Sequence, residues 1–139
     1  MKIYKFGGAS VKDAEGIKNV VRVLRNEGFK NTLIVISAMG KMTNAFEKII
    51  NSYHYKTDDL LQHIEFVEDY HSTIINALFE NKLTPIFKEV EVLFKELNKF
   101  LNANKSKDYN FIYDQIVGFG ELLSTKIVSA YLKDRKSVV

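Results

Sequence analysis

Residues 2–24 read KIYKFGGASVKDAEGIKNVVRVL, and this stretch decides the fold. Its start, KIYKF (2–6), alternates and is rich in β-forming residues, which predicts a strand. After two consecutive glycines, apolar residues recur at the spacing of one helical face, at Ile17, Val20, Val21 and Leu24. Asp13 is placed to cap this helix and Gly28 to end it. The stretch therefore predicts a strand that passes through a glycine turn into a helix.

A second strand completes a βαβ unit. TLIVIS (32–37) is a short, continuous apolar run with β-branched residues, which is typical of a strand covered on both faces in a parallel sheet. The order strand, helix, strand predicts an α/β fold with parallel strands. AMGKMTN (38–44) is then a polar loop. In such sheets both loops that follow the strands lie at the same carboxyl edge, where ligands bind.

The middle of the chain is predicted to be helical. One helix follows the loop, with Phe46, Ile49, Ile50 and Tyr53 on one side, and a second covers about 58–81. A third helix, within 83–101, begins with Thr84 as its N-cap and Pro85 at its first helical position. Only a few residues separate the second and third helices, so we expect an antiparallel hairpin.

The last helix runs from about Tyr109 to Leu132 and contains Gly118 and Gly120. Each interior glycine costs about 1 kcal/mol relative to alanine. Two of them predict a bend, or a backbone that a ligand approaches closely. DRKSVV (134–139) has the pattern of a turn followed by the start of another strand, which indicates a chain that is cut short.

Composition narrows the class of protein. The chain has 139 residues, the size of one ordinary domain, and 46% of them are hydrophobic. Its formal charge of +3 is too mild and too evenly mixed for nucleic-acid binding. There is no cysteine, no signal peptide and no apolar run near the ~20 residues that a membrane span needs. We therefore expect a cytoplasmic protein that binds neither nucleic acid nor membrane.

The glycine loop has the chemistry of a phosphate site. Gly7 and Gly8 place backbone N–H groups between a strand and a helix, where successive amides and the helix dipole attract an anion. Lys5 adds a full positive charge beside them, which suits the phosphate chain of a nucleotide. A plain strand-to-helix turn with a solvated lysine is the alternative.

Two other groups are candidates for contact with a ligand. In the second loop Ser37 and Thr43 offer hydroxyls, although Thr43 or its neighbour would equally cap the next helix. Glu121, in GFGELLS (118–124), could accept a hydrogen bond from an ammonium group, although an exposed glutamate near a helix bend is the alternative. His71 falls in the apolar face of its helix, so we expect a core histidine, and we predict no metal site.

Three motifs together resemble those of aspartate kinases, within the amino acid kinase superfamily. KFGGASV (5–11), VISAMGKMTN (35–44) and GFGELLSTKIVSAYL (118–132) occur in the order seen in that family. The resemblance implies an α/β, amino acid kinase-like fold with a partial parallel sheet, flanking helices and a long helical hairpin. It also implies that residues 1–139 form the amino-terminal, aspartate-binding lobe, without the nucleotide lobe and the regulatory domains.

The resemblance also implies an activity. Aspartate kinases transfer the γ-phosphoryl group of ATP to the β-carboxylate of aspartate, the first step of lysine, threonine and methionine biosynthesis. The implied partners are aspartate and ATP with Mg²⁺, and the full-length protein is expected to be a homo-oligomer, whereas this lobe alone is expected to be inactive. Two alternatives stay open: a superfamily kinase with an acceptor such as acetylglutamate, and a non-catalytic module that binds phosphate or a partner.

The family's site residues carry over to this sequence by resemblance only. Lys5 matches the catalytic lysine that lies against the transferring phosphate, and Glu121 matches the glutamate that receives the aspartate amino group. The implied ATP and phosphate contacts are Lys5, Phe6, Gly7, Gly8 and Ser37. The implied aspartate contacts are Ser10, Thr43 and Glu121. Ala9 stands where many members have threonine, which we regard as a minor variation.

Overall fold

The computed structural model of the chain describes residues 1–134, so the predicted last strand, within 135–139, lies outside the described residues. The elements in chain order are β1 (Lys2–Phe6), α1 (Ala14–Glu27), β2 (Thr32–Ile36), α2 (Met42–Tyr55), α3 (Leu60–Leu78), α4 (Pro85–Ala103) and α5 (Tyr109–Asp134). The predicted order of strand, helix and strand, followed by helices, is confirmed. Asp134, which was expected in a turn, is the last residue of α5.

β1 and β2 form a parallel, two-stranded sheet, and α1 connects them. Residues 2–6 pair in continuous register with residues 32–36. α1 begins where the Asp13 carboxylate accepts a hydrogen bond from the backbone N–H of Gly16 at 2.8 Å. It ends at Gly28, whose φ of 82° is a conformation that favours glycine. The predicted βαβ unit is therefore confirmed together with both ends of its helix.

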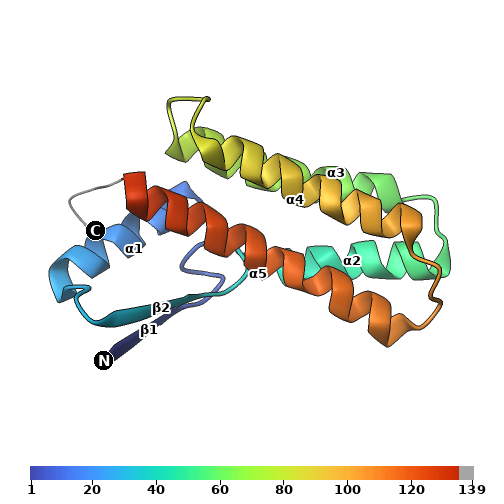
Figure 1. The fold of residues 1–139 in the computed structure, drawn as a ribbon, viewed down its shortest axis with the longest axis horizontal. Helices are drawn as coiled ribbons and strands as arrows, with labels where there is room; N and C mark the ends of the chain where they lie inside the picture. Colours follow the sequence, from blue (N-terminus) through green and yellow to red (C-terminus); the bar gives the residue numbers. More distant parts are fainter. Residues whose placement is uncertain (135–139) are drawn as a thin grey trace.

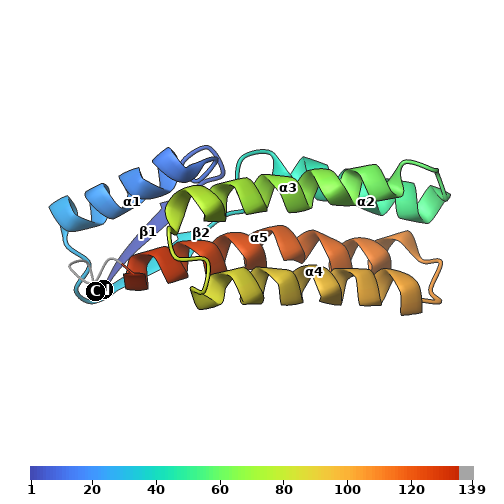
Figure 2. The ribbon, with the colours of Figure 1, turned by 90° about the horizontal axis from the view of Figure 1, so that it is seen from above.

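Helices α2 to α5 pack lengthwise as a bundle that extends away from the sheet (Figures 1 and 2). α3 and α4 run antiparallel (Figure 1) and contact each other, which confirms the predicted hairpin. α5 packs against α2 and α4, and its carboxyl-terminal half reaches β2. Apolar side chains buried in the bundle include Phe46, Ile49, Val67, Leu93, Leu97, Ile116 and Ile127. α5 therefore ties the sheet to the bundle.

One face of the sheet is open, which corrects the prediction that the second strand is covered on both faces. Ile3, Leu33 and Val35 are 56%, 49% and 41% exposed, while Ile34 and Ile36 pack against the core. α5 lies on the face of Ile34 and Ile36, and the described residues leave the other face in contact with solvent. A continuous apolar run does not distinguish one covered face from two.

The second loop is shorter than predicted. α2 begins at Met42, so Thr43 and Asn44 lie in its first turn and not in a loop over 38–44. The N-cap is Lys41, and no side chain caps the helix. The alternative in which Thr43 or Asn44 acts as the cap is therefore wrong.

The bounds of α4 and α5 agree closely with the prediction, but the roles predicted for Thr84 and for the two glycines of α5 do not. Thr84 and Pro85 occupy the expected positions at the start of α4, but the Thr84 hydroxyl donates to the carbonyl of Asn81 at 2.6 Å and does not cap the helix. α5 passes through Gly118 and Gly120 as one continuous helix.

Across residues 1–134, no helix combines the length and the apolar character needed to cross a membrane.

Candidate functional site

The glycine loop and the second loop are hydrogen-bonded to each other at the carboxyl edge of the sheet. The N–H of Ser37 donates to the carbonyl of Phe6 at 3.0 Å, which continues the strand pairing beyond β2. The N–H of Gly40 then donates to the carbonyl of Gly8 at 2.9 Å. The prediction that both loops share one edge is confirmed, and the two loops form a single backbone unit.

Only the second of the two consecutive glycines is required by this loop packing. A Cβ on Gly8 would lie 2.6 Å from the carbonyl oxygen of Gly40 and 2.9 Å from that of Ala38, which is too close for any side chain. A Cβ on Gly7 would meet nothing within 4 Å. Gly8 therefore allows the loops to touch, while Gly7 leaves the outer side of the turn open.

The backbone of the glycine turn has amides available to an anion. The N–H of Ser10 donates to the carbonyl of Gly7 at 3.0 Å, which closes the turn. The N–H groups of Gly7, Gly8 and Ala9 donate none of the loop hydrogen bonds formed within residues 1–134. The amino terminus of α1 is already occupied by the Asp13 carboxylate. A phosphate here would therefore be held by turn amides and less by the helix dipole than the sequence suggested.

The third motif reaches the same edge through Gly120. A Cβ on Gly120 would lie 3.2 Å from the Cβ of Ala38 and 3.3 Å from the ring of Phe46. α5 therefore packs directly on the residue that follows Ser37, and Glu121 is the next residue of that helix. The glycine is needed for contact between helices and the loop, not for a bend. A Cβ on Gly118 would meet nothing within 4 Å.

The side chains predicted to form the site do not contact one another. Lys5, Thr43 and Glu121 are exposed, and their side chains form no hydrogen bond or ion pair within residues 1–134. Lys5 alternates with the inward-facing Tyr4 and so leaves β1 on the open face of the sheet, whereas α5, which bears Glu121, lies on the other face. The structure thus brings the backbones of the three motifs together but does not bring these three side chains into contact.

A cavity of about 750 Å³ adjoins the two loops on the side of α3. Three lysines line it, Lys12 from the end of the glycine loop, Lys41 from the second loop and Lys48 from α2, and no carboxylate does. None of the predicted site residues lines this cavity. Sequence reasoning missed these lysines, although Lys12 and Lys41 lie beside or inside the quoted motifs.

Tyr70 of α3 holds the glycine loop to the bundle and lies close to the second loop. Its hydroxyl donates a hydrogen bond to the carbonyl of Lys12. A Cβ on Gly40, where φ is 51°, would lie 2.7 Å from the same hydroxyl oxygen. Burial, together with the charge of Asp13, raises the pKa of Tyr70, so its hydroxyl stays a donor.

His71 is a core residue, as predicted. It is fully buried, and its Nδ1 lies 2.8 Å from the carbonyl oxygen of Val67. Burial lowers the pKa of His71 to about 4, so the imidazole is neutral at physiological pH. Its Nε2 has no hydrogen-bond partner among the described residues. In residues 1–134, no three histidine, aspartate or glutamate side chains are grouped to hold a metal ion.

Comparison with known proteins identifies the family. The profile described as the amino acid kinase family matches residues 1–137. The chain belongs to the amino acid kinase family. The superfamily to which the three motifs pointed is therefore confirmed.

Curated relatives of this family member include two aspartokinases of Arabidopsis thaliana. "Aspartokinase 2, chloroplastic" is 33% identical over 134 residues, which cover 94% of this chain and 24% of the relative. "Aspartokinase 1, chloroplastic" is 30% identical over 137 residues, which cover 94% of this chain and 23% of the relative. The chain thus spans about a quarter of the length of these relatives. Because both are named as chloroplastic, the cytoplasmic location stays a prediction.

Solved structures confirm the fold of this family member. E. coli aspartokinase III in complex with aspartate and ADP has a TM-score of 0.82 and 22% identity, over 98% of this chain and 29% of that one. The same enzyme in complex with lysine and aspartate has a TM-score of 0.83 at 22% identity. The predicted amino acid kinase-like α/β fold is therefore confirmed.

Proposed function

We propose that this chain is the aspartate-binding part of an aspartate kinase, which transfers the γ-phosphoryl group of ATP to the β-carboxylate of L-aspartate. One observation carries the proposal: the two loops are joined through Gly8 and Gly40, with turn amides free for phosphate, and Gly120 seats α5 against the same edge. Similarity to proteins named as aspartokinases along 94% of the chain supports it. So does the fold shared with an aspartokinase that binds aspartate and ADP.

The glycine loop would bind the phosphate chain of the nucleotide. The backbone amides of Gly7, Gly8 and Ala9, which follow Phe6 at the end of β1, would hold phosphate oxygens, with the Ser37 hydroxyl beside them. The Lys5 ammonium would stabilise the negative charge on the phosphoryl group as it leaves ADP. Lys5 has no carboxylate partner within residues 1–134, so its full charge is available to a ligand.

Aspartate would bind between α2 and α5. Glu121 would accept hydrogen bonds from its ammonium group, and the hydroxyls of Thr43 and Ser10 would hold its carboxylates. Phosphoryl transfer needs positioning and charge stabilisation and little covalent chemistry from the protein. The role of these residues is therefore to point one β-carboxylate oxygen at the γ-phosphorus.

Mg²⁺ would reach the site with the nucleotide. Residues 5–10 and 37–41, the two loops at the edge, contain no carboxylate. Their amide, hydroxyl and ammonium groups suit phosphate oxygens and not a divalent cation. These loops would therefore bind the nucleotide, and the ligands of the metal would come from the phosphates and from other parts of the enzyme. The metal, when bound, would neutralise part of the negative charge of the nucleotide's phosphates. A homo-oligomeric full-length enzyme remains part of the proposal.

Steady-state kinetics of the full-length enzyme test the residue roles. We expect Glu121→Gln to raise the KM for aspartate about tenfold or more, as the loss of one charged hydrogen bond of about 1.5–3 kcal/mol implies, and to leave the KM for ATP unchanged. We expect Lys5→Gln to lower kcat about a hundredfold or more. The exposed residues Glu96 and Lys99 of α4 provide matched controls, Glu96→Gln and Lys99→Gln, which should change neither constant.

Three outcomes would contradict the proposal. Kinetics unchanged by both Lys5→Gln and Glu121→Gln would favour a non-catalytic binding module. Preferential phosphorylation of acetylglutamate in a substrate panel would assign a different acceptor. ADP release at ordinary enzyme rates from the 139-residue chain alone, with ATP, Mg²⁺ and aspartate, would show that the lobe is not merely a part of the active unit.

A further inference from the structure

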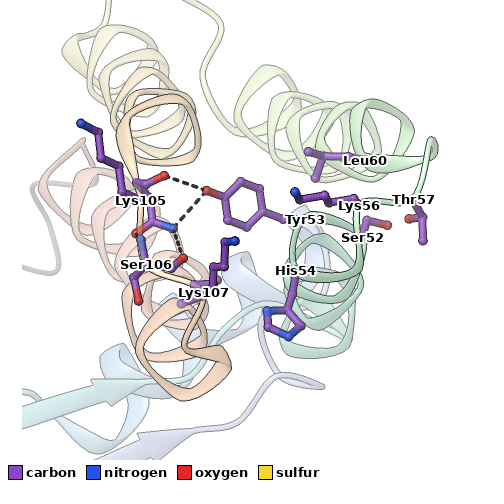
Figure 3. A pocket seen from close by; sticks show the side chains of 11 residues that line it. Ser52, Tyr53, His54, Lys56, Thr57, Leu60, Lys105, Ser106 and Lys107 are labelled. Atoms are coloured by element: carbon purple, nitrogen blue, oxygen red, sulfur yellow. Dashed lines mark hydrogen bonds between the residues drawn. The ribbon is translucent and has the colours of Figure 1, made fainter.

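A second cationic cavity lies at the end of the helical bundle farthest from the sheet (Figures 1 and 3). Its volume is about 600 Å³, and its walls are the carboxyl end of α2, the turn after it and the α4–α5 connection at 104–107. α2 has 14 residues, so at about 1.5 Å of rise per residue its two ends are about 21 Å apart. The cavity is therefore separate from the candidate kinase site, where α2 begins.

The α4–α5 connection is a built structure even though it is polar and exposed. The Asn104 side-chain amide donates to the Tyr53 hydroxyl and to the carbonyl of Ser106, each at 3.0 Å, and its oxygen accepts from the N–H of Ser106 at 3.1 Å. The Ser106 hydroxyl oxygen then accepts from the N–H of Asp108 at 3.2 Å. These bonds fix the loop against α2, so the cavity is formed before any ligand arrives.

Two ammonium groups point into this cavity. Figure 3 shows the side chains of Lys56 and Lys107 directed toward the space beside Tyr53, whereas that of Lys105 points away from it. Lys56 is the C-cap residue of α2, with φ of 55°, and Lys107 lies in the α4–α5 connection. The two lysines therefore come from separate elements and converge.

The described residues offer these lysines no negative partner. Lys56 and Lys107 form no ion pair within residues 1–134, and no carboxylate lines the cavity. The carboxylate of Asp59, the N-cap residue of α3, already accepts hydrogen bonds from Ser52, Thr57 and His63. Two like charges that converge without a counter-charge repel each other, and an anion placed between them would remove that repulsion.

We propose that this cavity binds a small polyanion, a phosphate ester or a polycarboxylate, held by Lys56 and Lys107. The volume lies within the range of about 300–1,000 Å³ typical of small-molecule sites. His54 adds a ring nitrogen at the opening and is fixed by edge contacts with Tyr55 and Tyr109 at 4.7 and 5.1 Å between ring centroids. The site is independent of the proposed kinase function, because no residue assigned to aspartate or ATP lines it.

Amide chemical shifts of the ¹⁵N-labelled 139-residue chain test the proposal, because they report where an anion binds. Sodium pyrophosphate and sodium citrate are titrated separately, against sodium chloride at equal ionic strength. We expect saturable shifts at residues 53–57 and 104–107 with one or both anions, and the more effective of the two identifies the phosphate or the carboxylate class. Shifts that follow ionic strength alone, or that do not saturate, would overturn the proposal.

Variants separate this cavity from the glycine loop, which also attracts phosphate. The Lys56→Gln/Lys107→Gln pair should weaken binding at 53–57 and 104–107 tenfold or more. Lys105→Gln, from the same loop but directed away, should change it less than twofold. Lys5→Gln should leave it intact whatever happens at residues 7–12, so the kinase proposal and this one can fail separately. Equal losses with Lys105→Gln and with the pair would refute a built site.

Discussion

The N–H of Gly40 lies 2.9 Å from the carbonyl oxygen of Gly8, and it donates the hydrogen bond that joins the loops after β1 and β2. Because Gly8 has no side chain, the two backbones can approach until a Cβ there would be 2.6 Å from the Gly40 oxygen. The candidate phosphate turn is thus supported by the second loop.

We expect Gly8→Ala to destabilise the protein by about 1–3 kcal/mol, the usual cost of forcing a group into packed space. The colliding atoms are backbone oxygens, which cannot rotate away. Gly7→Ala is the matched control, because its Cβ would meet nothing within 4 Å and its φ is not positive. Urea unfolding of the two variants measures the difference. Equal midpoints would mean that the loops are not in contact.

Replacing each of the two glycines of α5 by alanine should change the stability of the protein in opposite directions. Gly118→Ala adds a methyl group in open space and should stabilise the protein by up to about 1 kcal/mol through helix propensity. Gly120→Ala gains the same propensity, but its methyl group would press on Ala38 and on the Phe46 ring, so we expect a net loss. Thermal unfolding gives both values. Stabilisation by Gly120→Ala would show that α5 does not pack on the second loop.

Tyr70→Phe removes the hydroxyl that holds the carbonyl of Lys12. We expect a loss of about 1 kcal/mol, the usual net value of one hydrogen bond, and faster amide exchange in the glycine loop, with the helices of the bundle unchanged. Hydrogen exchange followed residue by residue tests this. Tyr4→Phe is a suitable control, since the described residues give the Tyr4 hydroxyl no hydrogen bond.

Acid should weaken the protein through His71. Burial lowers the pKa of His71 from its ordinary value of 6.5 to about 4, so between these values the unfolded chain binds a proton that the folded chain does not. The free energy of unfolding should therefore be unaffected above pH 6.5 and fall as the pH drops toward 4, by on the order of 3 kcal/mol.

Urea unfolding at pH 7.5 and pH 4.5 measures the acid effect. Carboxylates also titrate in this range, so the informative quantity is the difference between the natural chain and His71→Leu, which cannot take up a proton. We expect the drop in stability to be smaller in His71→Leu. An equal drop in both proteins would mean that His71 is accessible to protons in the folded state.

Local patterns in the sequence predicted the βαβ unit and the helices well. The period of Ile17, Val20 and Leu24 identifies one buried face, and Asp13 and Gly28 mark the ends of α1 because capping depends on adjacent residues. Membership of the amino acid kinase family followed from three motifs in order, and the comparisons confirmed it.

Features that depend on contacts distant in sequence could not be predicted in the same way. The reason for Gly120 is its approach to Ala38, about eighty residues away in the chain, and no local pattern encodes it. The boundary of α2 moved because its cap uses no side chain, so Thr43 looked like a cap and is not one. The cavity at Lys56 and Lys107 arises only when α2 meets the α4–α5 connection.

The open sheet face has a practical consequence for purification. Ile3, Leu33 and Val35 form an apolar band on two strands, each of which keeps an unpaired edge among the described residues. Covering such surface gains about 25 cal/mol per Å², and a bare edge can recruit another strand. The sedimentation coefficient of the 139-residue chain should therefore rise with concentration. Leu33→Lys should keep the chain monomeric and leave the stability of the helical bundle unchanged, because the bundle lies on the opposite face of the sheet.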